Sequence, residues 1–480
     1  MLRYHTAISS LRHCVLSRQH GIRTLSKLPA ALQCQSRHSE PASYTKELLQ
    51  KVDTQFEDKY KTVFRSKSRQ QLVRAATVLW LCSFEVLVRH NQQLLKTSRK
   101  LLGRRLHEKL LQTTVYGQFV IGQKKETVKP IIADYLASGV GPILYYALEE
   151  DKSSHSKLGN DPFYASSVKS FKEAIDITSD AANKTGYIAV KPTALCSPNL
   201  WIRLTQVILS STKSADFDSY HKSSDLIADS KSLAAEEVEE LEKLVKRGEE
   251  IIEYAASAGV KVMIDAEQTY FQPAIQRILG VEMMSRFNRE SVNVLVTYQT
   301  YLKSAFENVD RDMEYCKREG IKFGARIVRG AYLDQERQLS ESNKYEDPTN
   351  PTFEATTRMY EKTAAHILNR ISEWKDGDIE VMFGTHNEGT LRQLFTLLSE
   401  SNPPLSSVCF GQLYGMCDHI TFHLGELGIP VYKSMPYGPV DIMTSYLGRR
   451  AIENRGVLDK VKKERQLLNK EIRREYGDEV

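Results

Sequence analysis

The stretch Val260–Glu267 reads VKVMIDAE, and its pattern decides the fold. Apolar side chains fall on both faces between Val260 and Ile264, as in parallel strands that helices cover on each side. An acid, Asp265, follows the apolar run at once. An amphipathic stretch, 235–258, is long enough for a helix and precedes it. The pattern therefore predicts one strand of a repeating strand–helix architecture.

Seven further apolar runs of this kind occur after about residue 139, with amphipathic stretches such as 353–374 between them. The eight runs are GPILYYALE (141–149), YIAVKPTAL (187–195), VKVMIDAE (260–267), VNVLVTYQ (292–299), FGARIVRGAY (323–332), IEVMFGTHN (379–387), VCFGQLYG (408–415) and VYKSMPYG (431–438). Eight strand–helix units predict an α/β protein with a (β/α)8 TIM-type barrel, which we place at residues 136–460. A doubly wound open sheet is the alternative on pattern alone.

The polar residues that follow the apolar runs favour the closed barrel. They are Lys191, Asp265, Gln299, Arg326 with Arg329, His386, Gln412 and the KSMPYG turn (433–438). Closing the sheet brings the carboxyl ends of all strands to one mouth, where barrel enzymes place their active sites. We therefore expect these side chains to converge there.

A second stretch, YLGRRAIEN (446–454), follows the last run and predicts an anion-binding helix. Adjacent arginines lie about 100° apart on a helix, so Arg449 and Arg450 converge on one anion only if the helix faces a pocket. Tyr446 and Glu453 lie on the same face of that helix as the two arginines. Guanidinium groups suit bidentate recognition of a carboxylate. The alternative is an exposed helix whose Arg and Glu side chains form i,i+4 pairs.

Composition outside the barrel separates three more segments of this 480-residue chain. Residues 1–39 contain six basic residues and no acid, which predicts a mitochondrial transit peptide. Residues 40–135 form a helical extension, and residues 461–480 form a helical tail. The net charge of +6 comes from the first segment, since 60 basic and 60 acidic residues remain without it. Charge therefore gives no support for nucleic-acid binding.

The seven cysteines lack metal-site or CxxC spacing, so we read them as reduced thiols and predict no metal site. The most apolar window, 75–84, is too short to span a bilayer. No GxGxxG follows the first predicted strand, which leaves a Rossmann dinucleotide site unsupported. A mouth rich in cations with few bases suits an anionic ligand beside an electron-accepting cofactor such as a flavin.

Five motifs together resemble the proline dehydrogenase family: DAE (265–267), YQTYL (298–302), ARIVRGAY (325–332), GTHN (384–387) and YLGRRAIEN. The resemblance implies an FAD-bearing barrel that oxidises a cyclic imino acid. It assigns Asp265 and Arg326 to catalysis. The residues that it assigns to the substrate are Lys191, Tyr332, Tyr446, Arg449 and Arg450. From its spacing on the same helix, Glu453 can hold the two arginines in place. Those assigned to the flavin are Ala266, Gln299, Arg326, Arg329, Gly330, Ala331, Thr385 and His386.

One position departs from the family pattern. Members usually carry a Tyr four residues before the Gly of the last turn, and Ser434 stands there in VYKSMPYGP. A serine opens space over C4 of the ring and offers a hydroxyl that complements a 4-hydroxyl group. Together with VYGQF (115–119) and RRAIENRGVL (449–458), it makes the chain most similar to the hydroxyproline dehydrogenase branch. The expected substrate is trans-4-hydroxy-L-proline, and L-proline is the alternative.

The resemblance also implies ubiquinone as electron acceptor, in the inner mitochondrial membrane or on its matrix side. The basic and apolar extension at 72–111 is the candidate for membrane-surface association, and a plain cap on the barrel is the alternative. Two other classes of function stay open on the residues alone. A class I aldolase would use Lys191 as a Schiff base, and a carboxylate-binding scaffold would need no chemistry.

Overall fold

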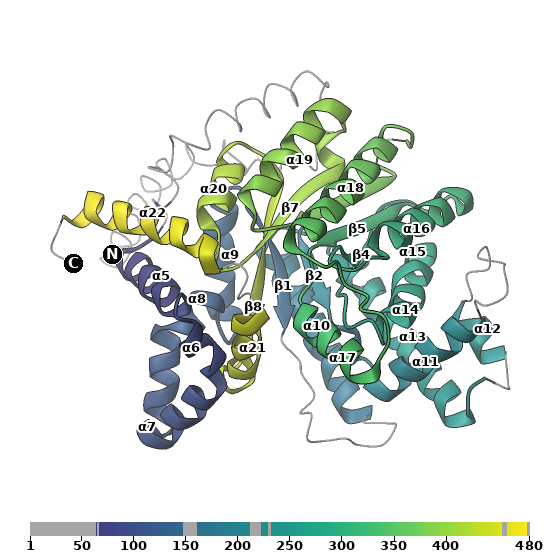
Figure 1. Cartoon of the computed structure of the whole chain (residues 1–480), viewed down its shortest axis with the longest axis horizontal. Helices are drawn as coiled ribbons and strands as arrows, with labels where there is room; N and C mark the ends of the chain where they lie inside the picture. The colour runs from purple at the N-terminus through teal and green to yellow at the C-terminus, as the bar shows by residue number, and fades with distance from the viewer. Residues whose placement is uncertain are drawn as a thin grey trace, which may run out of the picture.

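The computed structural model describes residues 64, 67–146, 161–211, 222–228, 232–375, 377–453 and 458–477. The side chains of residues 211, 228, 445, 449–453, 458–462 and 475–476 are not described. The expected transit peptide, residues 1–39, lies outside this part of the chain. Eight parallel strands close into a barrel in sequence order, with β1 paired to β8 (Figure 1). The predicted TIM-type barrel is therefore confirmed, and the doubly wound sheet is excluded.

Seven strands fall within one predicted apolar run each, and β1 begins one residue before its run. The strands are β1 Val140–Tyr146, β2 Tyr187–Val190, β3 Lys261–Ile264, β4 Val294–Gln299, β5 Phe323–Val328, β6 Ile379–Gly384, β7 Val408–Leu413 and β8 Val431–Tyr437. The helices around them are α10 Asp161–Ala181, α11 Pro198–Ser211, α12 Ser223–Ala228, α13 Ala235–Ser257, α14 Gln272–Ile275, α15 Glu282–Phe287, α16 Ala305–Glu319, α17 Leu333–Asn343, α18 Phe353–Ile371, α19 Glu388–Ser401, α20 Asp418–Glu426 and α21 Val440–Glu453. A π-helical turn, Gln276–Val281, joins α14 to α15.

Two hydrophobic cores follow from the strand alternation. The larger core fills the space between the strands and the outer helices, with residues such as Val262 and Phe410. The smaller core fills the barrel interior with Ile143, Met263, Leu295, Met382 and Tyr432, among others. This inner core continues into α21 through Met443 and Tyr446. α21 therefore packs directly on the contents of the barrel.

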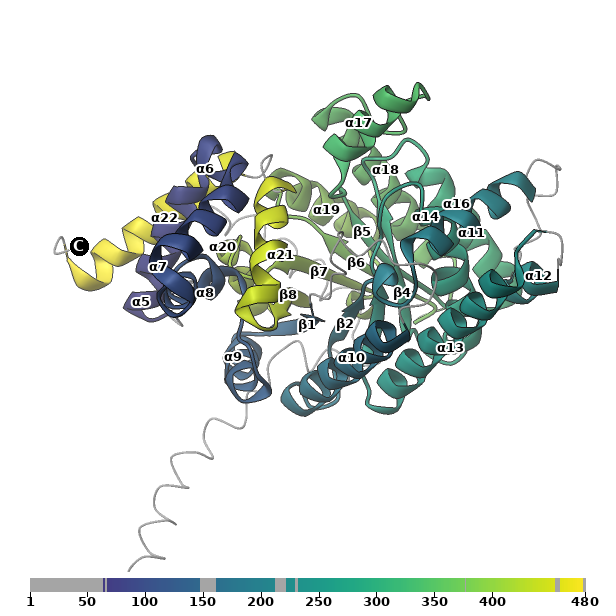
Figure 2. The same ribbon diagram turned by 90° about the horizontal axis from the view of Figure 1, so that it is seen from below.

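The N-terminal helices are α5 Arg69–Cys82, α6 Glu85–Arg89, α7 Asn91–Thr113, α8 Val115–Phe119 and α9 Lys125–Ala137. The C-terminal helix α22, Leu458–Tyr476, packs along α5. These elements stand beside the barrel, and α21 lies between them and the strands (Figure 2). Within the described ranges, no helix is both long and apolar enough to cross a membrane.

Contacts from the N-terminal helices fix the position of α21. Asn91 Nδ2 donates to the carbonyl of Gly448 at 3.0 Å, and a Cβ at Gly448 would lie 2.6 Å from Asn91 Oδ1. The Tyr116 hydroxyl donates to the carbonyl of Gly438, in the turn between β8 and α21, at 2.7 Å. Gly438 N in turn donates to the carbonyl of Gly122 at 3.0 Å. The extension therefore holds both the turn before α21 and the helix itself.

Candidate active site

The carboxyl ends of the strands carry most of the predicted site residues. Lys191 and Asp265 directly follow β2 and β3, and Gln299 ends β4. Arg326 lies two residues before the end of β5, and Ser434 lies within β8. Four of them are an even number of residues from an interior-facing side chain on the same strand, namely Ala189, Met263, Leu295 or Tyr432. The fifth, Arg326, has its Nη1 3.8 Å from the sulfur of the interior residue Met263. Because side chains alternate along a strand, these five positions project toward the barrel interior.

The centre of this group is an ion pair between Arg326 and Asp265. The Arg326 guanidinium donates to Asp265 Oδ1, and its Nε donates to Thr297 Oγ1 at 3.0 Å. The two side chains of the pair are 14% and 22% exposed, so a ligand in the mouth can still reach them. Charge-assisted bonding of this kind fixes the position of the carboxylate. Thr297 is an addition to the predicted set, and it lies directly across from Arg326 in the β4–β5 register.

A buried carboxylate, Glu267, supports the loops that carry Lys191 and Asp265. It accepts hydrogen bonds from Thr193 N at 2.9 Å and Thr193 Oγ1 at 3.1 Å. Gln299 Nε2 donates to the backbone carbonyl of Glu267 at 2.8 Å. Burial raises the pKa of Glu267, and the nearby Lys191 cation opposes that shift. Glu267 belongs to the DAE motif, but its role is not evident from the sequence alone, because its hydrogen-bond partners lie in other segments of the chain.

Arg329 lies apart from Arg326, which corrects the expectation that the two act together over one mouth. Its guanidinium donates to Thr357 Oγ1 at 3.0 Å and Thr390 Oγ1 at 2.8 Å. It also stacks over the ring of Phe353, 4.6 Å from the centroid. These partners lie in the N-terminal turns of α18 and α19. Residues three apart on an extended chain point to opposite faces, so only Arg326 faces the interior.

Gln412 is a second correction. Its Oε1 accepts a hydrogen bond from Thr421 Oγ1, in α20, at 3.0 Å. Gln412 is buried on the helix side of β7, so its side chain does not join the cluster in the mouth.

The segment after β5 depends on a glycine. Gly330 has φ 125°, a backbone conformation that side chains disfavour, and a Cβ there would lie 1.7 Å from the Tyr301 ring. The following Ala331 and Tyr332 are half-buried, and Tyr332 stands at the N-terminus of α17. The backbone of the RGAY motif therefore passes close to the ring of Tyr301, in the YQTYL motif.

His386 and Thr385 follow β6 and approach α19 and β7. His386 Nε2 accepts a hydrogen bond from Leu413 N at 2.9 Å. In its neutral form the ring therefore carries its hydrogen on Nδ1. Thr385 Oγ1 accepts from Asn387 N at 3.1 Å, which shapes the loop before α19. Ala266, the remaining predicted flavin contact, is half-buried beside Asp265.

The expected carboxylate clamp lies on α21. Tyr446 is 6% exposed, and its ring centroid lies 5.6 Å from that of Tyr145 in β1. Arg449, Arg450 and Glu453 belong to the end of the same helix, and their side chains lie outside the described part of the structure. The backbone thus places the predicted stripe on a helix that packs over the barrel interior.

Ser434 is half-buried, and its neighbour Lys433 is completely buried. Lys433 Nζ lies 2.9 Å from Asp418 Oδ1 and donates to the carbonyl of Leu413 at 3.0 Å. A second cation, Lys67, lies 2.7 Å from Asp418 Oδ2. The two cations hold the pKa of the Asp418 carboxyl below its usual range despite its burial. Since adjacent strand residues face opposite sides, this ion cluster anchors β8 from outside while Ser434 faces inward.

Glu464 joins the cluster from α22. It accepts from Cys417 N at 2.7 Å and Asp418 N at 2.9 Å, at the start of α20. Sequence reasoning missed this cluster, since its members are up to about 400 residues apart and share no motif.

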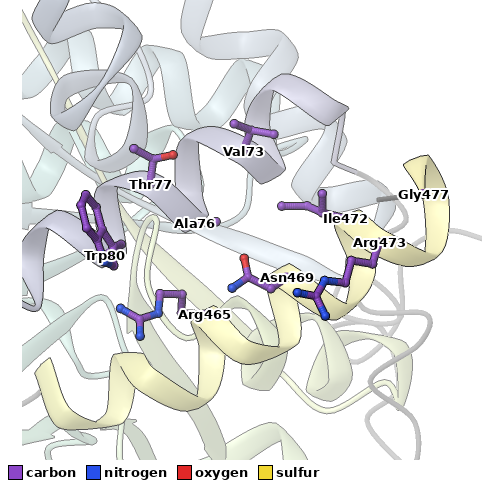
Figure 3. Close-up of a pocket in the computed structure, with 9 residues that line it drawn as sticks. All are labelled: Val73, Ala76, Thr77, Trp80, Arg465, Asn469, Ile472, Arg473 and Gly477. Atoms are coloured by element: carbon purple, nitrogen blue, oxygen red, sulfur yellow. The ribbon is translucent and has the colours of Figure 1, made fainter. Parts of the chain in front are cut away.

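A separate cavity of about 600 Å³ lies away from these residues, between α5 and α22 (Figure 3). Val73, Ala76, Trp80 and Ile472 give it apolar walls, and Arg465 and Arg473 add positive charge. None of the predicted site residues lines it.

Comparison of the sequence with known protein families identifies the family of this chain. Residues 158–463 match the family model described as proline dehydrogenase. The chain belongs to the proline dehydrogenase family. Its members are FAD-dependent oxidoreductases.

The sequence of this chain is about equally similar to relatives named proline dehydrogenase and to relatives named hydroxyproline dehydrogenase. It is 33% identical to proline dehydrogenase 1, mitochondrial, of Caenorhabditis elegans, over 90% of this chain and 91% of that protein. It is 35% identical to hydroxyproline dehydrogenase of Bos taurus, over 86% of this chain and 91% of that protein. These identities do not separate the two substrates.

A solved structure shares the fold. Proline utilization A from Bdellovibrio bacteriovorus, inactivated by N-propargylglycine, superimposes with a TM-score of 0.59 at 20% identity. The match covers 86% of this chain and 41% of that one, so the present chain spans about two-fifths of that protein's length.

The donor set at the strand ends fits the family's cofactor. Arg329 Nε and the Tyr301 hydroxyl are buried without a hydrogen-bond partner among the described residues. Arg329 also stands at the N-terminal turns of α18 and α19, where helix dipoles favour negative charge. Buried donors of this kind call for an acceptor-rich ligand, and a phosphate-bearing flavin nucleotide supplies such acceptors.

Proposed function

We propose that this chain is an FAD-dependent dehydrogenase that oxidises trans-4-hydroxy-L-proline to 1-pyrroline-3-hydroxy-5-carboxylate. L-Proline is a poorer substrate. The observation that carries the choice of substrate is Ser434, half-buried on the inner face of β8. The reaction opens the breakdown of hydroxyproline, and its electrons pass to a quinone.

FAD, when bound, supplies the acceptor for the hydride that leaves the imino acid ring. The residues that we propose to hold it are Ala266, Gln299, Arg326, Arg329, Gly330, Ala331, Thr385 and His386. The loop conformation at Gly330 and the buried donor on Arg329 support this assignment. His386 Nε2 accepts a hydrogen bond from Leu413 N, which fixes the orientation of the ring.

The substrate carboxylate binds to cations of the mouth and of α21. We assign Lys191, Arg449 and Arg450 to this clamp, with Glu453 holding the arginines and with Tyr332 and Tyr446 as walls. Support comes from the backbone position of α21 and from the packing of Tyr446 on Tyr145. A fixed ring has lost its translational and rotational freedom before the reaction, and this is a large part of such catalysis.

Asp265 and Arg326 act on the ring nitrogen. Because Arg326 holds Asp265 as an ionised acceptor, the carboxylate can take a hydrogen bond from the substrate amine and orient it. Since Arg326 already holds one oxygen of Asp265 in place, we assign Asp265 the role of orienting the substrate amine. Asp265→Asn would then lower kcat more than it raises KM.

The discriminating experiment replaces Ser434 and compares kcat/KM for the two imino acids. Ser434→Tyr fills the space beside the ring and should shift preference toward L-proline by about tenfold or more. Ser434→Ala is the matched control, since it keeps the space but removes the hydroxyl. If Ser434→Ala lowers hydroxyproline turnover alone, the hydroxyl recognises the 4-hydroxyl group. A wild-type enzyme that prefers L-proline would refute the assignment.

L-Proline dehydrogenase activity, giving 1-pyrroline-5-carboxylate, is the second candidate. It is supported by relatives named proline dehydrogenase 1, including those of Drosophila melanogaster at 34% identity and Homo sapiens at 33%. Both relatives are named as mitochondrial, which together with the composition of residues 1–39 supports a mitochondrial location. Ubiquinone is the proposed acceptor, at the inner membrane or its matrix side.

A further inference from the structure

Helix α7 is a helical hairpin rather than one continuous helix. Gly103 has φ 69° and ψ 169°, which breaks the helix. The Ser98 hydroxyl lies 2.9 Å from His107 Nδ1. Residues nine apart in a continuous helix would be separated by about 13 Å along its axis. The chain therefore folds back at Gly103, and residues 100–106 (KLLGRRL) form the tip of the hairpin.

This hairpin tip is strongly apolar for an exposed surface. Leu101 is 79% exposed, Leu106 is 62% exposed and Leu102 is 42% exposed. Of the 14 exposed large apolar side chains in the described residues, nine lie between residues 80 and 110. Concentrations of this kind mark interaction sites, whereas scattered single residues do not.

The tip is also positively charged. Residues 80–110 contain seven Lys or Arg and two acids, although residues 40–480 carry equal numbers of basic and acidic residues. Lys100, Arg104 and Arg105 are exposed within the tip itself. Arg104 also reaches Glu108 at 2.7 Å and Asp441, at the start of α21, at 3.3 Å. Leucines and cations thus occupy one short turn.

The base of the hairpin is held firmly against the enzyme. His107 and Leu111 are buried, and Asn91 at the start of α7 donates to the carbonyl of Gly448 in α21. The hairpin stands to one side of the barrel (Figures 1 and 2). Anything that the tip binds is therefore held at a fixed position relative to α21.

We propose that the hairpin tip docks this enzyme on an anionic phospholipid surface. Exposed leucines enter the interfacial region, while flanking Lys and Arg extend their charges toward lipid phosphates. Charge complementarity commits the proposal to an anionic lipid surface, since exposed cations stand directly beside exposed leucines in the tip. This surface goes beyond the proposed oxidation reaction, which needs only the barrel and α21.

The test is co-sedimentation of the full chain with vesicles. Phosphatidylcholine vesicles with added cardiolipin should bind it, and binding should weaken in high salt. Lys100→Gln with Arg105→Gln should reduce binding about 25-fold, at about fivefold for each cation. Leu101→Ser, Leu102→Ser and Leu106→Ser together should abolish it. Matched controls are Leu209→Ser in α11, where Leu209 is 53% exposed, and Lys246→Gln in α13.

Turnover with a water-soluble quinone is measured on the same variants. It should stay at the wild-type level, which shows that the variants are folded and separates this proposal from the proposed activity. Wild-type binding that equals that of the triple leucine variant would overturn the proposal. The absence of wild-type binding to anionic vesicles would also overturn it. In that case, light scattering that shows self-association through the tip would identify a second copy of this chain as the partner.

Discussion

The hydroxyl of Tyr116 offers a small change with a traceable effect on the site. It donates to the carbonyl of Gly438 at 2.7 Å, and the side chain is 4% exposed. Gly438 joins β8, which carries Ser434, to α21, which carries the proposed clamp. Tyr116→Phe removes one oxygen and leaves the packing of the ring unchanged.

The loss leaves a buried carbonyl without this donor, which costs about 1–3 kcal/mol. Because Gly438 N still donates to the carbonyl of Gly122, the turn loosens rather than unfolds. We expect the free energy of unfolding to fall by about 1–2 kcal/mol. We also expect KM for the imino acid to rise about fivefold with little change in kcat, since about 1 kcal/mol of preorganisation is lost from the clamp.

Urea unfolding checks the change in the free energy of unfolding, and steady-state kinetics on the same protein checks the change in KM. Tyr254→Phe is the control, since the Tyr254 hydroxyl donates to Asp176 at 2.8 Å on the outer helices. It should leave KM unchanged. If Tyr116→Phe lowers stability but leaves KM at the wild-type value, the N-terminal contact supports the fold and does not position α21.

Three further predictions test the anchoring of β8, the α22 contact and the RGAY loop. Lys433→Met should cost about 3–5 kcal/mol in urea unfolding, because Asp418 loses one of its two buried cations; a cost below about 1 kcal/mol would contradict the anchoring role. Burial raises the pKa of Glu464 to about 7, so the folded state holds this proton more tightly than the unfolded chain does. The contribution of this carboxyl to stability should therefore decline, by about 3 kcal/mol at most, as pH rises from about 4.5 to about 7. Glu464→Gln should flatten that decline in unfolding measurements at several pH values, and an unchanged slope would argue against it. Gly330→Ala should lower Tm and flavin content far more than Gly320→Ala. Both glycines have positive φ, but only at Gly330 would the added Cβ collide with a side chain, the Tyr301 ring. Equal effects of the two substitutions would exclude the steric explanation.

Local pattern was sufficient for the barrel. Each strand matches one run recognised by its apolar content, with β1 starting one residue early. Asp265 and Arg326 were expected near one another from their places at the strand ends. The same reasoning failed at Arg329 and Gln412. Arg329 follows β5 and Gln412 lies one residue before the end of β7, but their side chains point to the outer helices. Counting residues by twos along β5 and β7 would have separated them from the interior set.

Other features required contacts between distant residues. The buried cluster around Lys433 and Asp418 draws on Lys67 and Glu464, which approach only when α22 and the N-terminal segment pack beside β8. Nothing in the local sequence distinguishes Lys433 from an exposed lysine.

The sequence by itself determined the strand–helix repeat, the neutral charge of residues 40–480 and the family to which the chain belongs. These depend on residue type and spacing, which local sterics and burial translate directly into strands and helices. Only the tertiary structure decided that α7 doubles back at Gly103, that Tyr116 holds the turn before α21, and which arginine faces the interior. Those features depend on barrel closure and helix packing, which join residues that the chain keeps hundreds of positions apart.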